Sequence, residues 1–239
     1  MNPLAWLAPS AKRIDFWGIY SRVYDALREL ASYREMLDEV VVAAELCRGA
    51  RLVDLGCGTG NLAAQLLDSE PASLVCVDSS PEMTSRARDK LASANVEVIT
   101  DTIEAYLVRA PRHSADRLFA VNVLYTLQDR RTVWRLVHEV LKPGGMLVVA
   151  HCDRSGFWPV VKHQVKHGWW TLLRPRLLLI GILQVVIEAR AVSGRYEHAS
   201  FAALAREAAE TGLAPTFRGR TYGTKPDGLA FVATFQRAG

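Results

Sequence analysis

Short apolar runs alternate with amphipathic stretches along the chain between about residues 50 and 150. The runs at 51–55, 74–78, 96–100, 117–122 and 146–151 have the length and composition of buried strands. Helical patterns begin at Leu62, after Ser80 (a cap followed by Pro81) and at Arg131, and the last pattern stops at the Lys-Pro-Gly-Gly sequence of 142–145. Alternation at this spacing predicts an α/β fold with a doubly wound, mainly parallel sheet.

The two ends of the chain depart from this alternation. A helical pattern covers 20–48, a second one covers about 155–193, and a helix is expected at 201–211. Two strand-like runs, 214–222 and 229–235, flank a turn sequence at 225–228 and predict a closing hairpin. We therefore expect one domain over 1–239, with an N-terminal helical cap (1–48), a core (49–153), an inserted helical lid (154–195) and a final helix and hairpin (196–239).

Composition limits the classes of protein to which the chain can belong. With 239 residues, half of them hydrophobic, it is long enough to bury a full core. A net charge of +4 is too mild to indicate nucleic-acid binding. The four cysteines form no Cys-x-x-Cys pair, which favours reduced thiols and a cytoplasmic protein. We expect no signal peptide, and the longest uncharged apolar run, 177–187, is too short to span a bilayer.

The segment from Asp54 to Gly60, DLGCGTG, carries the most specific chemical signal. Its alternate glycines stand between a strand and a helix, where the backbone must turn sharply and come close to a ligand. The spacing is Gly-x-Gly-x-Gly, whereas dinucleotide-binding loops have Gly-x-Gly-x-x-Gly. The Asp54 carboxylate would repel a pyrophosphate and attract an ammonium group. The segment therefore indicates a ligand that joins a nucleoside to an amino acid.

Three motifs together resemble the class I S-adenosylmethionine-dependent methyltransferases of the small-molecule type. These motifs are 54–60, the sequence VDSSPEM at 77–83 and the sequence LKPGGM at 141–146. The resemblance covers about residues 20–150, and the terminal hairpin adds to it. It implies a Rossmann-like mixed sheet of seven strands with the last strand antiparallel. It also implies S-adenosyl-L-methionine as the cofactor.

The resemblance further implies roles for individual residues. The glycines would let the backbone pass the methionine moiety, Asp54 would hold its ammonium group, and Asp78 would accept both ribose hydroxyls. Met83 would lie against the adenine, and Asp101 with Thr102 would face its amino group, although Asp78 and Asp101 also have the alternative of being helix caps or loop acids. The cofactor-binding residues implied in this way are Tyr20, Asp54, Gly56, Gly58, Gly60, Asn61, Asp78, Ser79, Met83, Asp101, Thr102 and Asn122.

The segment after the fourth strand bears on the substrate. Methyltransferases that act on nucleobase amines resemble one another in an Asn/Asp-Pro-Pro-aromatic motif, and residues 122–125 read NVLY. We therefore expect no nucleic-acid partner and a small, fairly hydrophobic acceptor of the quinone, polyketide, terpenoid or other natural-product type. Two alternatives stay open, a membrane-surface lipid methyltransferase and a non-catalytic S-adenosylmethionine-binding protein. The oligomeric state is not predicted.

Candidate catalytic groups lie where the parallel strands end. Ligands bind beyond the carboxyl ends of such strands, which are followed here by Asn122, Tyr125, His151 and Asp153. A general base is needed only if the acceptor must lose a proton. We name His151 and Tyr125 as the catalytic candidates, and a merely pocket-lining role is the alternative for His151.

Tyr20 and Tyr24 are four residues apart and share a helical face. This Tyr-x-x-x-Tyr-Asp segment resembles the N-terminal segment that folds over the cofactor in many small-molecule methyltransferases. A helix packed on the sheet through aromatic anchors is the alternative.

The insertion at 155–193 combines three tryptophans with basic residues and has no acidic residue before Glu188. This composition predicts a hydrophobic lid and permits peripheral membrane contact. A pair of core helices with a solvated basic side is the alternative. His163 and His167 have metal-like spacing, but the absence of a nearby acidic residue in the sequence favours a solvated basic face, and we predict no metal.

Overall fold

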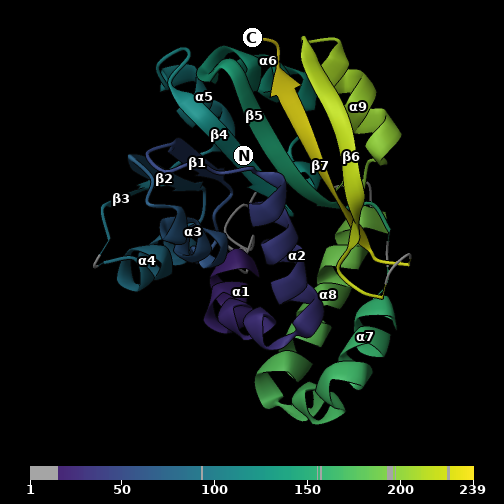
Figure 1. Cartoon of the computed structure of the whole chain (residues 1–239). Helices are drawn as coiled ribbons and strands as arrows, with labels where there is room; N and C mark the ends of the chain where they lie inside the picture. The colour runs from purple at the N-terminus through teal and green to yellow at the C-terminus, as the bar shows by residue number, and fades with distance from the viewer. Residues whose placement is uncertain are drawn as a thin grey trace, which may run out of the picture.

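The computed structural model describes residues 16–92, 94–154, 156, 158–192, 196, 198–224 and 227–239. One sheet of seven strands crosses it in the order β3-β2-β1-β4-β5-β7-β6 (Figure 1). The first five strands are parallel, and β7 runs antiparallel to both of its neighbours. The expected mixed seven-stranded sheet is confirmed. The strands are β1 Arg51–Leu55, β2 Ser73–Asp78, β3 Val96–Thr100, β4 Ala115–Val121, β5 Leu141–Cys152, β6 Leu213–Thr221 and β7 Ala230–Arg237.

Helices cover both faces of the sheet (Figure 1). They are α1 Phe16–Tyr24, α2 Ala31–Ala43, α3 Asn61–Leu66, α4 Pro81–Lys90, α5 Ile103–Arg109, α6 Arg130–Val140, α7 Trp158–Gly168, α8 Pro175–Val192 and α9 Phe201–Ala209. Short 3₁₀ turns add η2 Asp25–Glu29, η3 Leu67–Ser69, η4 Leu124–Thr126 and η5 Trp169–Leu173. Ser80 caps α4 as expected, because its hydroxyl accepts a hydrogen bond from the Met83 N–H and Pro81 occupies the first turn.

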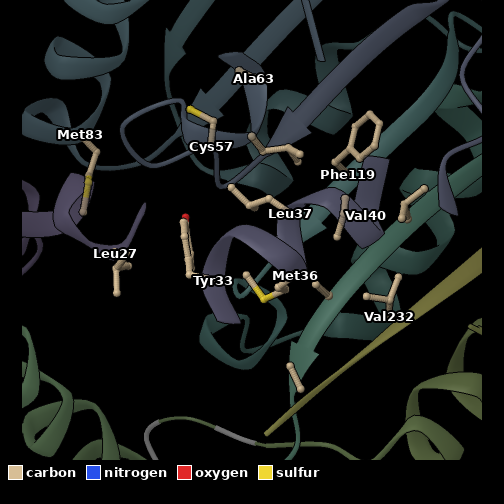
Figure 2. Packing of buried hydrophobic residues seen from close by; sticks show 14 of the residues in the cluster. Leu27, Tyr33, Met36, Leu37, Val40, Cys57, Ala63, Met83, Phe119 and Val232 are labelled. Carbon is tan, nitrogen blue, oxygen red and sulfur yellow. The ribbon is translucent and has the colours of Figure 1, made fainter. Parts of the chain in front are cut away.

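Alternate residues of the central strands separate the core into two layers. Val148 and Ala150 of β5 belong to the layer formed with α1, α2, α3 and α8. Leu147 and Val149 belong to the layer formed with α5, α6 and α9. Figure 2 shows part of the first layer, with Met36, Leu37 and Val40 of α2 between the glycine loop and the strands that carry Phe119 and Val232.

Two local predictions differ from the structure. The N-terminal helical region is interrupted at Leu30, whose extended backbone (φ −80°, ψ 124°) separates η2 from α2. The sequence Lys142–Gly145 follows the end of α6 as expected, but it already lies within β5, with Gly144 at φ +74°. A register shift between β4 and β5 accommodates this irregular start, so the strand begins earlier than the apolar pattern alone indicates.

The insertion forms α7, η5 and α8, which lie beyond the lower ends of β5 and β7 in Figure 1. Helix α8 packs against α1 and η2, and α7 packs against α2. Within the part of the chain that the structure describes, no single helix has the length and apolar composition to cross a membrane. Residues 158–173 and 175–187 together meet that test only as a pair bent by 112°.

Candidate functional site

A loop with left-handed glycines follows β1. Gly56, Gly58 and Gly60 have φ values of +73°, +54° and +78°, a conformation that residues with a Cβ adopt at a cost. At Gly56 there is a second reason for glycine, because a Cβ would lie 2.5 Å from Cγ2 of Val123. The loop therefore passes close to the segment after β4 and presents its backbone toward the carboxyl ends of the strands.

Asp78, the last residue of β2, fixes this loop from the side. Its Oδ2 accepts a hydrogen bond from the Gly58 N–H and its Oδ1 accepts one from the Ser80 N–H, both at 2.9 Å. Burial raises the pKa of the Asp78 carboxyl, and these two hydrogen bonds partly oppose that rise. Each carboxylate oxygen keeps lone-pair capacity for a ligand hydroxyl, so holding the loop and holding a ribose are compatible.

Asp54 is a buried carboxyl without a full set of partners. It is 2% exposed, and its Oδ2 has no hydrogen bond within the described residues. Burial, followed by the charge of Asp78, raises its pKa to about 7. A buried carboxylate without a partner destabilises the folded chain. A cationic ligand group beside Asp54 would therefore stabilise it.

A cavity of about 340 Å³ lies beside the loop. Asp78, Ser79 and Met83 line one part of it, and Asn122 and Tyr125 line another. Its wall also contains six of the chain's seven tyrosines, which are Tyr20, Tyr24, Tyr33, Tyr125, Tyr196 and Tyr222. The sequence separates these tyrosines by up to about two hundred residues, and the fold gathers them into one aromatic wall.

Helix α1 contributes to the wall of this cavity. The rings of Tyr20 and Tyr24 meet edge to face with centroids 5.2 Å apart, and both line the cavity. A Cβ on Gly58 would lie 3.4 Å from the Tyr24 ring. Asp25 accepts hydrogen bonds from the Thr59 hydroxyl at 2.5 Å and from the Lys90 ammonium at 2.7 Å. The segment formed by α1 and η2 is therefore held against the glycine loop by these contacts.

Asn122 occupies a strained position directly after β4. Its φ of +52° is unusual for a residue other than glycine, and asparagine tolerates it better than most. Its N–H donates to the Ala150 carbonyl at 2.8 Å, and its Oδ1 accepts from the Cys152 thiol at 3.3 Å. These contacts hold the Asn122 side chain at the cavity wall, in the manner of strained residues at functional sites.

The sequence profile of the family described as "Methyltransferase domain" matches residues 52–145. That range contains the glycine loop, Asp78 and Asn122. The chain carries a class I S-adenosylmethionine-dependent methyltransferase domain.

Curated relatives agree with this assignment. The chain is 30% identical to methyltransferase GfsG of Streptomyces halstedii over 145 residues, which are 60% of this chain and 52% of that protein. It is 29% identical to the 27-O-demethylrifamycin SV methyltransferase of Amycolatopsis mediterranei over 116 residues, which are 48% of this chain and 43% of that protein. The chain thus spans about half the length of the curated relatives it matches.

Solved structures share the fold. A S-adenosylmethionine-dependent methyltransferase from Mesorhizobium loti superposes with a TM-score of 0.62 at 17% identity, covering 88% of this chain and 100% of that one. An S-adenosylmethionine-dependent methyltransferase from Thermotoga maritima superposes with a TM-score of 0.59 at 19% identity, covering 93% of this chain and 99% of that one. At these identities the likeness establishes the Rossmann-like fold.

The family and the fold imply S-adenosyl-L-methionine as the cofactor of the methyltransferase domain, and the residues present fit it. The unpartnered Oδ2 of Asp54 suits an ammonium group, although Asp54 is buried at the end of β1 and is not among the residues that line the cavity. Asp78, Ser79 and Met83 line the cavity next to the loop. These features match a ligand with a cationic amino-acid end and a ribose.

Several sequence-based candidates in the methyltransferase domain lie outside the cavity wall. Asn61 is buried, and its Oδ1 accepts a hydrogen bond from Lys90 at 2.6 Å. Asp101 pairs with Arg109, and Thr102 caps α5 by accepting from the Ala105 N–H. The cofactor roles of Asn61, Asp101 and Thr102 therefore stay predictions, and in this structure their side chains bond to other parts of the chain.

The histidine named from the sequence is also set back from the cavity. His151 is fully buried, and neither of its ring nitrogens has a hydrogen bond of good geometry within the described residues. Burial and then the neighbouring His198 lower its pKa to about 4, and Asp153 and the backbone of Ala199 oppose this only partly. His151 contacts Tyr125, with ring centroids 6.2 Å apart, and is a neutral residue behind the cavity wall.

His198 is a functional candidate that the sequence did not reveal. It lines the cavity, and its ring lies 5.3 Å from that of Tyr125. Its Nδ1 lies 2.8 Å from the Cys152 carbonyl oxygen, which can only accept, so Nδ1 carries the proton. Nε2 is buried and has no partner among the described residues, which leaves its lone pair available. No spacing or motif around His198 marks it in the sequence.

The lid histidines differ from the predicted solvated face. His163 is buried, and its Nε2 lies 3.0 Å from Oε1 of Glu35 on α2. The His167 ring stacks on that of His163, and its Nε2 lies 3.8 Å from the same oxygen. Glu35 precedes His163 by 128 residues, so this contact is invisible to local patterns. The contacts of His163 and His167 with Glu35 hold α7 against α2.

Proposed function

We propose that this protein transfers a methyl group from S-adenosylmethionine to a small, fairly hydrophobic acceptor of the quinone, polyketide, terpenoid or similar natural-product type. One observation supports this most directly: a single cavity runs from Asp78 and Met83 beside the glycine loop to the aromatic wall of Tyr125 and Tyr196. A cofactor and an acceptor would therefore share one cavity, as in-line transfer requires.

S-adenosylmethionine supplies a sulfonium methyl group as the electrophile. The chain supplies position and a shielded surface. Burial raises the pKa values of the Tyr24, Tyr125 and Tyr222 phenols well above the ordinary value, so these groups stay protonated near neutral pH. Protonated phenols can donate hydrogen bonds to the oxygens of an acceptor, while the ring faces pack against its apolar body. Both properties favour an oxygenated ring system.

His198 is the proposed base for acceptors that must lose a proton. The Cys152 carbonyl holds its Nδ1–H, and Nε2 is then the atom that would accept the acceptor's proton. The electron pair freed in this way would stay on the acceptor and make it a nucleophile. Tyr125, in ring contact with His198, would orient the same acceptor through its hydroxyl.

Some relatives have names consistent with this acceptor class. They are the 27-O-demethylrifamycin SV methyltransferase and the ubiquinone/menaquinone biosynthesis C-methyltransferase UbiE of Cronobacter sakazakii, 29% identical over 148 residues. Others are named for different acceptors, such as the trans-aconitate 2-methyltransferase of Azoarcus sp., 37% identical over 112 residues. The names of the relatives include O-, C- and N-methyltransferases, so the methylated atom stays open. We place the chain in the cytoplasm, which is favoured by four cysteines that form no disulfide with one another.

Transfer of a labelled methyl group from S-adenosylmethionine to a panel of quinols, phenols and hydroxylated polyketides tests the proposal. We expect a labelled organic-extractable product with at least one member of the panel. A chain that binds S-adenosylhomocysteine but labels no apolar or polar acceptor would instead be a non-catalytic binding protein. Labelling of nucleic acid alone would contradict the proposed acceptor class.

A further inference from the structure

The surface of the lid is unusually apolar. Among the described residues, fourteen large hydrophobic side chains are exposed, and ten of them lie on α7, η5 and α8. The lid surface is defined by these ten residues, Trp158, Val165, Trp169, Trp170, Leu173, Leu178, Leu179, Ile182, Val185 and Val186. An apolar surface concentrated on one segment of the chain indicates a binding site for an apolar partner.

Helix α8 shows the same property within one element. Leu177, Ile180, Leu183 and Ile187 are buried and belong to the core layer formed with α1 and α2. Residues on the opposite side, among them Ile182 and Val185, are more than 60% exposed. A helix that is apolar on all sides is expected to be covered on all sides. The outer side of α8 therefore lacks a cover in the isolated chain.

The charges around the apolar surface of the lid indicate which partner covers it. The sequence has no acidic residue between Arg154 and Ile187, while Lys162, Lys166 and Arg176 are exposed among the apolar residues of the lid. Arg174 is held by Glu29 at 2.5 Å. Tryptophan and basic side chains beside an apolar surface match the boundary between the headgroups and acyl chains of an anionic bilayer. We propose that the lid docks on an anionic lipid bilayer.

A second copy of the chain fits this surface less well. A two-fold contact would place the same lid against itself and bring Lys162, Lys166 and Arg176 of both copies together. Like charges at such a contact repel, and the lid offers no acidic side chain in 155–187 to compensate. An anionic bilayer supplies the missing negative charge and the apolar cover at once.

Docking would also bring the membrane to the cavity. Gln184 and Ile187 of α8 line the cavity and lie within about one and a half turns of the exposed Ile182 and Val185. The helix that contacts the bilayer is thus also a wall of the site. For this step the inference rests on the proposed function, because it makes the bilayer the source of the hydrophobic acceptor.

Sedimentation with vesicles of phosphatidylcholine, with and without phosphatidylglycerol, tests the docking. We expect the intact chain to sediment with the anionic vesicles and far less with the neutral ones. The triple variant K162E/K166E/R176E should lose on the order of a hundredfold in partitioning, and W169S/W170S should lose a comparable amount. The matched control V42S/V108S, at exposed apolar residues outside the lid, should sediment like the intact chain.

Three results would overturn the docking. They are failure of the intact chain to sediment with anionic vesicles, equal loss in the V42S/V108S control, and a dimer in light scattering that W169S/W170S converts to a monomer. Binding of S-adenosylhomocysteine, measured on the same samples, separates this inference from the proposed function. Retained binding without sedimentation refutes only the docking, and sedimentation without binding refutes only the methyl transfer.

Discussion

The backbone N–H of Gly58 donates a hydrogen bond to Oδ2 of Asp78 over 2.9 Å, which joins the middle of the glycine loop to the end of β2. The same carboxyl accepts the Ser80 N–H at the start of α4. One acidic side chain therefore holds the loop, the strand end and the following helix in a fixed relation. These hydrogen bonds restrict the loop, which lowers the entropy cost of binding a ligand there.

Replacing Asp78 by alanine should remove both the loop anchor and the proposed contact with the ribose. Hydrogen bonds to a charged group contribute about 1.5–3 kcal/mol each, so we expect the affinity for S-adenosylhomocysteine to fall at least a hundredfold. Calorimetric titration measures the change. Asp116→Ala is the matched control, because Asp116 pairs with Lys142 at the opposite end of the sheet. Similar affinities for the two variants would exclude the ribose role.

Asp54 should make cofactor binding depend on pH. Its pKa is raised to about 7, and only the ionised form attracts an ammonium group. The affinity for S-adenosylhomocysteine should therefore fall as the pH drops below 7, by up to about tenfold per pH unit, with proton release on binding near pH 7. Titrations in buffers of different ionisation enthalpy detect this release. The Asp54→Asn variant should bind S-adenosylhomocysteine weakly and with an affinity that does not depend on pH. If the affinity of this variant still depends on pH, another titrating group is responsible.

The same carboxyl should destabilise the ligand-free chain at higher pH. The folded state keeps a proton that the unfolded state loses near pH 4, so stability is lost as the pH rises from about 4 to about 7. A shift of this size corresponds to about 4 kcal/mol. Asp54→Asn should therefore unfold at higher urea than the unaltered chain at pH 8, with a smaller difference at pH 5. A variant less stable at both values would contradict this.

Two glycines of the loop should respond differently to substitution by alanine. At Gly56 the new Cβ would meet Val123 at 2.5 Å in addition to the cost of φ +73°, whereas at Gly58 its nearest neighbour is the Tyr24 ring at 3.4 Å. We expect Gly56→Ala to lower the free energy of unfolding by about 2–5 kcal/mol and Gly58→Ala by about 1–2 kcal/mol. Urea unfolding provides both values. A larger loss of stability in Gly58→Ala than in Gly56→Ala would show that the loop relaxes around Val123.

The two histidines near Tyr125 can be separated by isosteric substitution. His198→Asn keeps an N–H for the Cys152 carbonyl and removes Nε2, so methyl transfer should fall at least a hundredfold while S-adenosylhomocysteine binding stays unchanged. His151→Gln should change turnover severalfold at most, because His151 lies behind the cavity wall. A large loss in the His151 variant alone would restore the sequence-based choice of base.

Much of the core could be predicted from the sequence because its signals are local. The strand ending at Leu55, the glycine loop and the Ser80 cap all depend on neighbouring residues. Their motifs also fix their order in the sheet once the family is recognised. The seven-stranded mixed sheet follows from these signals and is confirmed.

The acceptor side of the site depends on contacts between distant segments. His198, Tyr33 and Tyr222 come from different elements and meet only when the sheet is assembled. The same reason explains why Glu35 was not expected beside His163. Sequence periodicity identified His151 at a strand end but could not show that its ring lies in the layer behind the cavity.

Calorimetric titration of the intact chain with S-adenosylhomocysteine, with NAD as the comparison ligand, decides which kind of ligand the cavity binds. We expect saturable binding of S-adenosylhomocysteine and none of NAD, because Asp54 attracts an ammonium group and repels a pyrophosphate. Preferential binding of NAD, or no binding of S-adenosylhomocysteine between pH 7 and 8, where Asp54 becomes ionised, would contradict the assignment of this cavity to the methyl donor.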